Sequence, residues 1–238
     1  MKIPEGITTV LFDLDGTLRH HDPNGFDLFL EYAADLGIPI DSGARQKIGQ
    51  WTHKYWANSE CLVNDKKAFN SENGEFWQNY AKRQFEAFGI ETEQAFAWAP
   101  AAQKFMEKKF RPEDVIYKNV YETLQILKEK PYHLGLVTNR SQPIDEYLNE
   151  KGLTEYFDFY FHAGEIDAWK PNPKIFEHAL NLANAEANEA IYIGDNYYAD
   201  VVGARNASIF PVLLDKDGIF PEADCKVIQK IVELQEYL

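Results

Sequence analysis

The chain contains 238 residues, of which 45% are hydrophobic, so it can form one large domain or a core domain that carries one insertion. Its formal net charge of −14 argues against nucleic acid and anionic membrane surfaces as main partners. The same charge repels phosphorylated molecules at long range, so a phosphate site in this protein needs cations of its own.

The sequence gives no sign of export or of membrane insertion. The N-terminal segment Met1–Gly6 has neither a long apolar region nor a cleavage pattern, so we expect no signal peptide. The sequence as a whole contains no uninterrupted run of about 18 apolar residues, so we expect no membrane span. The two cysteines, Cys61 and Cys225, fit no metal or redox spacing, which favours reduced thiols in a cytoplasmic protein.

The stretch from Val10 to Leu18, VLFDLDGTL, carries the strongest functional signal. It begins as an apolar run that is typical of a buried strand and ends on two carboxylates, Asp13 and Asp15. Like charges this close raise each other's pKa unless a cation or hydrogen bonds compensate. The pattern favours a divalent-metal site whose first carboxylate can act as a nucleophile, although Asp-Gly alone is also a common turn.

The segment from Arg19 to about Val115 shows helical patterns and no convincing strand. Apolar residues at three- and four-residue spacings predict helices over 26–36, 74–88 and 100–110. Four of the five tryptophans fall in this segment: Trp51, Trp56, Trp77 and Trp98. We interpret residues 19–115 as a small all-helical domain with an aromatic core of its own.

Strand and helix signals alternate in the rest of the chain. The sequence predicts strands at 133–137, 157–162, 190–193 and 209–214, and helices at 121–129, 143–151, 173–183, 198–206 and 227–238. Short strands separated by helices predict a mostly parallel sheet with helices on both faces. The predicted fold is therefore α/β, with a Rossmann-like core made of residues 1–18 and 116–238.

Ligands of such sheets bind beyond the carboxyl ends of the strands. The polar residues that directly follow predicted strands are Asp13, Asp15, Thr138, Asn139, Asp195 and Asn196. Three separate stretches of the chain are therefore expected to converge on one edge of the sheet.

The order of these motifs resembles the haloacid dehalogenase-like hydrolase superfamily, whose members are mostly phosphatases. The motifs are DLDGT at 13–17, Thr138 after a strand, Lys170-Pro171, and GDNYYAD at 194–200. The predicted insertion sits where the members with a helical cap carry theirs. The resemblance covers the whole α/β portion and implies a Rossmann-like core with a mobile cap domain.

The resemblance implies a role for each motif residue. Asp13 would attack phosphorus and form an aspartyl-phosphate, while Asp15 would first protonate the leaving oxygen and then deprotonate water. Dehalogenases of the family generally lack an acid at the position of Asp15, so this residue favours phosphoryl transfer. The hydroxyl of Thr138 and the backbone amide of Asn139 would bind the non-bridging phosphate oxygens.

Charge compensation is implied for the remaining motif residues. Lys170 would bind the phosphate and steady charge in the transition state. Mg²⁺ would be held by Asp13, by Asp195 and by the backbone carbonyl of Asp15. Asp200 would orient Lys170 or a metal-bound water, and Asn196 is either an outer-shell group or a loop residue.

The predicted cap offers weaker candidates. His53, Tyr55, Trp56 and Arg83 are candidates for recognition of the leaving group, and the cap tryptophans form either a core or a base-stacking platform. His20 and His21 are expected at the hinge into the cap. Trp169 either lines the entrance of the site or packs in the core.

The resulting prediction is a magnesium-dependent phosphatase that acts on a small phosphorylated metabolite, as a monomer or small homo-oligomer. Alternatives with related chemistry are a phosphomutase and a phosphonate-cleaving enzyme, the latter with Lys47 or Lys54 as a Schiff-base lysine. Alternatives without turnover are a phospho-accepting signalling domain and a binding protein. Asp15 and the insertion argue against the signalling domain.

Overall fold

The computed structural model describes residues 2–72 and 74–238, so Met1 and Asn73 lie outside the described residues. The chain divides into two compact units. The core unit comprises Met1–His20 and Ile116–Leu238, and the helical unit comprises His21–Val115. The sequence analysis places these two junctions after residues 18 and 115.

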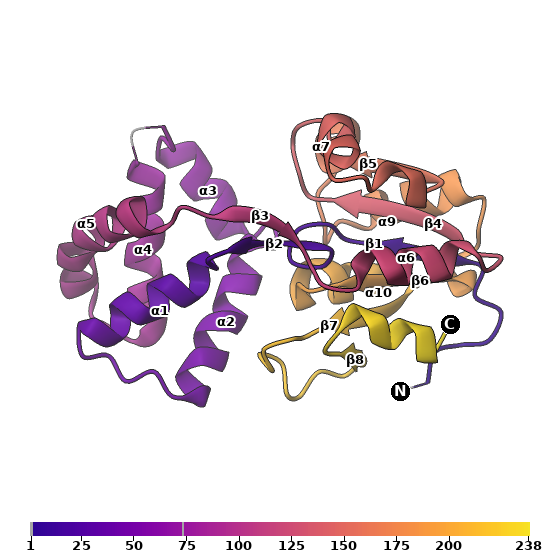
Figure 1. Ribbon diagram of the computed structural model, residues 1–238. Coiled ribbons are helices and arrows are strands. Elements are labelled where there is room, and N and C mark those ends of the chain that lie inside the picture. The colour runs from indigo at the N-terminus through magenta and orange to yellow at the C-terminus, as the bar shows by residue number, and fades with distance from the viewer. Residues whose placement is uncertain (1, 73) are drawn as a thin grey trace. The chain divides into compact units, whose positions relative to one another are not determined.

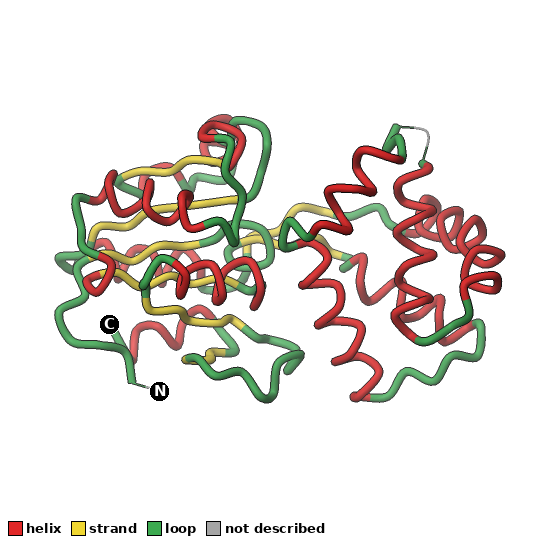
Figure 2. Tube along the Cα trace, turned by 180° about the vertical axis from the view of Figure 1, so that it is seen from behind, coloured by secondary structure: helices red, strands yellow, loops and turns green. Residues whose placement is uncertain are grey.

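The core unit is built on one parallel sheet (Figures 1 and 2). Within the described residues its strands lie in the order β5 (Phe159–His162), β4 (His133–Thr138), β1 (Thr9–Phe12), β6 (Ala190–Gly194), β7 (Phe210–Leu214) and β8 (Lys226–Ile228). Every neighbouring pair is parallel. The predicted α/β, Rossmann-like class is therefore confirmed.

Helices cover both faces of this sheet (Figure 1). They are α6 (Val120–Lys128), α7 (Asp145–Glu150), α8 (Ala163–Ile166), α9 (Pro173–Ala183) and α10 (Val202–Asn206), with the 3₁₀ helices η1 (Thr154–Tyr156), η2 (Ala187–Glu189) and η4 (Ile231–Glu236) and the π-helical turn η3 (Tyr197–Val201).

Alternation along β1 explains the two layers. Val10 and Phe12 pack in one cluster with α6, α7 and η4, whereas Leu11 packs in a second cluster with α9 and α10. Successive strand residues point to opposite faces, so a strand buried on both sides must be apolar throughout. This is why the sequence Thr9–Phe12 is a continuous buried run.

The position of β1 in the sheet determines where the site lies. From β1 the chain adds β4 and β5 on one side, and then β6, β7 and β8 on the other. The direction of strand addition thus reverses beside β1, which is the topological switch point where ligands of α/β sheets bind. Phe12 is in register with Leu136 of β4 and Ile193 of β6, so the residues after these strands are close neighbours.

The predicted C-terminal helix over 227–238 is wrong. Lys226–Ile228 instead forms the edge strand β8 on β7, and a 3₁₀ helix follows. The open edge of β7 supplies hydrogen-bond partners that outweigh the local helix propensity of this segment. Ile231 and Leu234, three residues apart, bury against the core as a 3₁₀ period requires.

The helical unit contains α1 (Gly25–Asp35), α2 (Ser42–Trp56), α3 (Glu60–Ala68), α4 (Glu75–Phe88) and α5 (Thr92–Lys109). The prediction of no strand from Arg19 to Val115 is wrong, because β2 (Arg19–Asp22) pairs with β3 (Glu113–Ile116) at the two ends of this segment. No long apolar run marks these strands, since most of their residues are partly or fully exposed. Among the described residues no helix is both long and apolar enough to cross a membrane.

Two helices of this unit were missed and one was placed too short. Helix α5 begins at Thr92 rather than at Pro100, which lies inside it. Its buried face consists of Ala95, Ala99 and Ala102, a spacing that packs well although proline interrupts the backbone hydrogen bonds. Helices α2 and α3 were not predicted because few of their residues are buried.

A buried ion pair ties three helices of the unit together. The Asp65 carboxylate on α3 accepts hydrogen bonds from Arg83 on α4 at 2.5 and 2.6 Å and from the Tyr55 hydroxyl on α2 at 2.9 Å. The Asp65 side chain is only 3% exposed. Tyr55 and Arg83, candidates for leaving-group recognition in the sequence, therefore hold a structural carboxylate.

We predict that Arg83→Met destabilises the protein by about 2 kcal/mol, because it leaves Asp65 buried without its cation. The value is lower than for a fully buried pair because Arg83 is 31% exposed. Arg45→Met, which breaks the more exposed pair with Asp27, should cost less than about 1 kcal/mol. Urea unfolding of both variants measures the difference in stability. Equal losses of stability would contradict a structural role for the Arg83–Asp65 pair.

Candidate active site

The site begins in a tight turn directly after β1. The amides of Leu18 and Arg19 donate to the Leu14 carbonyl at 3.0 and 3.1 Å, which turns the chain back after Asp13. Gly16 has a φ of +93°, and a Cβ there would lie 2.3 Å from an Asp195 carboxylate oxygen. Glycine at this position therefore allows both the turn and the close approach of Asp195.

Lys170 lies at the centre of a buried charge cluster. Its Nζ donates to Asp13 Oδ1 at 2.6 Å, to Asp200 Oδ1 at 2.7 Å and to the Tyr192 hydroxyl at 2.9 Å. The Lys170, Asp13 and Asp200 side chains are at most 6% exposed. The Tyr192 hydroxyl in turn donates to the Val137 carbonyl, so β4 and β6 both help to position the lysine.

The loop that carries Lys170 is fixed by Asn139. The Asn139 side chain accepts from the Lys170 amide at 2.7 Å and donates to the Lys170 carbonyl at 3.1 Å. The carboxylate of Asp200 is held as well, since its Oδ2 accepts from the Asn196 amide at 2.9 Å. A Cβ on Gly194 would lie 2.3 Å from the Asp200 side chain, so glycine is needed where β6 ends.

Asp15 occupies a different environment from Asp13. Arg140 donates to both Asp15 oxygens at 2.8 Å, and Arg19 adds a third hydrogen bond at 3.0 Å. The Thr138 hydroxyl lies 3.4 Å from Asp15 Oδ2. Arg140 itself stacks on the Tyr147 ring, with 4.3 Å between the guanidinium carbon and the ring centre. The Asp15 carboxylate is thus held by two cations although its side chain is 39% exposed.

These environments shift the pKa values of the acids in different directions. Burial raises the pKa of Asp13 to about 7, and the charge of Lys170 offsets only part of this effect. Burial, with the charge of Asp13, likewise raises the pKa of Asp195 to about 7. Burial also acts on Asp15, but hydrogen bonds from Arg140 and the charges of Arg140 and Arg19 outweigh it and leave its pKa below the ordinary value.

The residues present fit a divalent cation. Asp13, Asp195 and Asp200 each offer one carboxylate oxygen, and these oxygens lie within 4.8 Å of one another. Lys170 already binds Asp13 Oδ1 and Asp200, whereas the Thr17 hydroxyl lies between Asp13 Oδ2 (3.2 Å) and Asp195 Oδ1 (3.4 Å). Burial is the main cause of the raised pKa values of Asp13 and Asp195, and a bound cation would favour the ionised forms of both carboxyls.

The structure brings the predicted motif residues together in the core unit, while their chemical roles stay predictions. Asn196 acts as a helix cap, since its side chain accepts from the amides of Tyr198 and Ala199. Trp169 packs against the core. His20 stacks on Tyr117 with 4.2 Å between ring centres.

Sequence reasoning missed four residues of the site: Thr17, Arg19, Arg140 and Tyr192. Arg140 could have been found, because an acidic protein with a phosphate site needs local cations and Arg140 directly follows Thr138-Asn139. Tyr192 gave no signal, since an aromatic residue in a buried strand is ordinary.

We predict that Arg140→Met lowers catalytic turnover by about 10²-fold, because Asp15 loses its main hydrogen-bond partner and its fixed position. Lys151→Met removes the other cation near the Tyr147 ring and serves as a control. Steady-state kinetics of the two variants provide the measurement. An Arg140→Met variant as active as Lys151→Met would show that the hydrogen bonds from Arg140 to Asp15 are not needed for activity.

Comparison with known families decides the class of the chain. A family model for haloacid dehalogenase-like hydrolases matches residues 10–213. The chain belongs to this family. The match includes the whole helical unit and residues 10–20 and 116–213 of the core unit, whereas the sequence resemblance covers only the α/β portion.

Among curated proteins, the chain is similar to the pyrophosphatase PpaX of Bacillus thuringiensis (strain Al Hakam) and of Bacillus cereus (strain Q1). Each is 38% identical over 92 residues, which is 38% of this chain and 42% of the relative. The matched region thus covers less than half of these relatives.

Solved structures share the fold over nearly the whole chain. The HAD hydrolase YfnB from Bacillus subtilis, bound to magnesium, has a TM-score of 0.58 at 19% identity and covers 98% of both chains. A predicted phosphoglycolate phosphatase from Haemophilus somnus 129PT has a TM-score of 0.56 at 20% identity, with 97% of both chains covered. A 2-haloacid dehalogenase from Pseudomonas syringae pv. tomato DC3000 has a TM-score of 0.54 at 23% identity, again over 97% of both chains.

Proposed function

We propose that this hydrolase is a magnesium-dependent phosphatase that cleaves a small phosphate monoester through an aspartyl-phosphate. The observation that carries the proposal is the second acid, Asp15, held by Arg140 and Arg19 two residues from Asp13. A positioned carboxyl at this place can exchange a proton with a leaving oxygen or with water. Carbon–halogen cleavage does not require that group, because halide leaves without a proton.

The proposed reaction uses the chain's own groups in two displacements. Asp15 must carry a proton when the substrate binds, although hydrogen bonds from Arg140 and the charges of Arg140 and Arg19 lower the pKa of its carboxyl in this structure. An Asp13 oxygen then attacks phosphorus, the bond from phosphorus to the leaving oxygen breaks, and Asp15 gives its proton to that oxygen. Asp15 then takes a proton from a water molecule, which attacks phosphorus, releases phosphate and regenerates the Asp13 carboxylate. Lys170 holds Asp13 and supplies positive charge throughout, and the Thr138 hydroxyl and Asn139 amide are the proposed phosphate donors.

Magnesium is the proposed cofactor. Asp13, Asp195 and the Asp15 carbonyl would hold it, with Asp200 acting through Lys170 as its partner. When bound, Mg²⁺ would neutralise the acidic cluster and the charge of the phosphate. The helical unit is proposed to act as the cap that excludes water during the reaction.

The structure bears differently on the three alternative activities, which are phosphonate cleavage, phosphoryl transfer by a mutase and phosphoanhydride cleavage. Lys47 and Lys54 are exposed on α2, so neither has the desolvated surroundings that activate a Schiff-base lysine. A phosphomutase would use the same Asp13 and Asp15 and is separated only by its product. The similarity to PpaX favours a second candidate activity, cleavage of a phosphoanhydride, within the same site.

The test is phosphate release from a panel of phosphate monoesters and inorganic pyrophosphate, with Mg²⁺ and with EDTA. We expect release that depends on Mg²⁺ for at least one substrate. A 2-haloacid and a phosphonate belong in the panel, because release of halide, or cleavage of the carbon–phosphorus bond alone, would overturn the proposal. Transfer of the phosphoryl group back to a sugar phosphate without net release would identify a mutase.

A further inference from the structure

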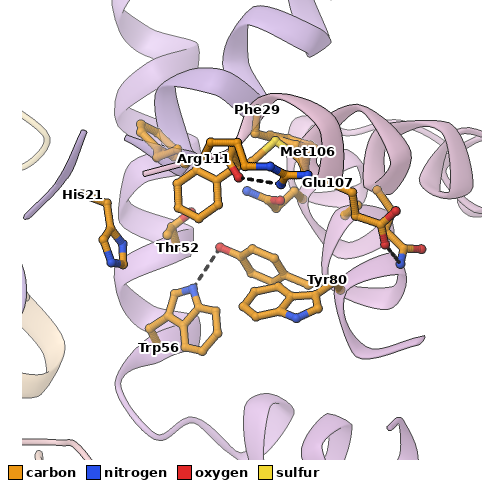
Figure 3. A pocket seen from close by; sticks show the side chains of 15 residues that line it. His21, Phe29, Thr52, Trp56, Tyr80, Met106, Glu107 and Arg111 are labelled. Atoms are coloured by element: carbon orange, nitrogen blue, oxygen red, sulfur yellow. Dashed lines mark hydrogen bonds between the residues drawn. The ribbon is translucent and has the colours of Figure 1, made fainter. Parts of the chain in front are cut away.

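The helical unit contains a partly open cavity of about 580 Å³ that the proposed chemistry does not use (Figure 3). All of its lining residues belong to this unit, and they come from α1, α2, α4, α5 and the segments next to α1 and α5. Figure 3 shows Phe29, Trp56, Tyr80 and Met106 around the same space. The volume lies within the range of about 300–1,000 Å³ that is usual for small-molecule sites.

The cavity lies between two packed clusters rather than within one. Phe29 and Met106 belong to the cluster centred on α1, α4 and α5, whereas Trp56 and Tyr80 belong to the cluster of α2, α3 and α4. The cavity lining includes six Phe, Trp and Tyr residues: Phe26, Phe29, Trp56, Trp77, Tyr80 and Phe110.

The aromatic wall is held in a fixed orientation. The Trp56 indole nitrogen donates to the Tyr80 hydroxyl at 2.9 Å, and the two ring centres are 5.3 Å apart. Trp77, which also lines the cavity, is 48% exposed and packs 6.1 Å from Trp56. Large rings oriented in this way offer flat surfaces on which another ring can stack.

Gln84 is the polar residue of the cavity wall that we use to infer the kind of ligand. It lines the cavity and the residue is 4% exposed, yet its amide oxygen and nitrogen are not among the described side-chain atoms that are buried without a hydrogen-bond partner. A side-chain amide in the wall of a cavity offers one acceptor and two donor hydrogens to a ligand that enters it. A ligand that presents a donor beside an acceptor would satisfy both ends of this amide.

We propose that this cavity binds a planar nitrogen heterocycle whose edge carries a neighbouring donor and acceptor, as the edges of nucleobases do. Stacking on Trp56, Tyr80 and Trp77 holds its faces, and Gln84 pairs with its edge. A purely apolar ligand would make no hydrogen bond with the Gln84 amide. The proposal does not rest on the phosphatase activity, because binding is measured without catalysis.

The test is binding of adenosine, guanosine, cytidine and uridine to the full-length protein, measured by calorimetry and by quenching of tryptophan fluorescence. Nucleosides carry no phosphate, so the acidic site makes no contribution. We expect at least one nucleoside to bind the wild-type protein with 1:1 stoichiometry. Its affinity should be at least tenfold lower for Gln84→Leu. Its affinity should be unchanged for Gln78→Leu, a control on the same helix outside the cavity. Asp13→Asn should bind it as tightly as the wild type.

A second measurement covers the case in which Gln84→Leu does not fold. In the wild-type protein, the NMR signal of the Gln84 side-chain amide should shift when the nucleoside saturates. Naphthalene, a planar apolar molecule without hydrogen-bonding groups, is tested in the same way. If naphthalene binds and no nucleoside does, or if neither binds, the proposal is overturned. Nucleoside binding that leaves the Gln84 amide signal in place would overturn the assigned contact.

Discussion

Asp13→Asn should abolish magnesium-dependent phosphate release, with a loss of about 10⁴-fold or more in kcat. An amide is a poor nucleophile, and no other carboxylate takes the place of Asp13 at the end of β1. Asn can still accept a hydrogen bond from Lys170 through its oxygen, so the variant should keep the fold. Phosphate release and far-UV circular dichroism, measured side by side, separate loss of chemistry from loss of structure.

Asp35→Asn is the matched control, because it makes the same change at an exposed position of α1. It should retain full activity. A folded Asp13→Asn variant that keeps more than about a hundredth of the wild-type rate would exclude Asp13 as the nucleophile, since residual catalysis from binding groups alone is far smaller.

Lys170→Met should impair both activity and stability. It leaves Asp13 and Asp200 buried without the cation that both contact, and loss of one partner of a buried pair typically costs about 3–5 kcal/mol. Loss of its charge in the transition state should lower kcat by a further factor of about 10²–10³ or more. Urea unfolding in EDTA and steady-state kinetics in Mg²⁺ measure the two effects separately.

The control for this variant is Lys174→Met, which removes an exposed lysine at the start of α9. Its stability should change by less than about 0.5 kcal/mol. If Lys170→Met unfolds at the same urea concentration as Lys174→Met, the cluster around Lys170 is not a structural charge network. If it is as active as the wild type, Lys170 is not required for phosphoryl transfer.

The sequence predicts the core of this protein well because burial on both faces leaves a clear pattern. Residues 10–12, 134–137 and 190–194 are continuous buried runs without a charged residue, and each is followed at once by polar residues of the site. Helix α9 agrees with its predicted range of 173–183, because Pro173 marks its start.

The remaining features depend on tertiary contacts that leave little trace in sequence. The pairing of β2 with β3 and the addition of β8 to the sheet edge are set by neighbouring backbone rather than by hydrophobic pattern. The hydrogen bond from Arg140 to Asp15 joins residues that are 125 positions apart in the sequence. The cavity beside Gln84 likewise exists only once α1, α2, α4 and α5 have packed.

The most direct test of the proposed mechanism is detection of the phosphoryl-enzyme. The protein is mixed with its best substrate and Mg²⁺, quenched in acid within milliseconds and digested, and the peptides are analysed by mass spectrometry. The mechanism predicts one phosphoryl group on the peptide that contains Asp13, absent in Asp13→Asn and absent after full turnover. Turnover of the substrate with no phosphorylated Asp13 at any quench time would contradict it and indicate direct attack by water.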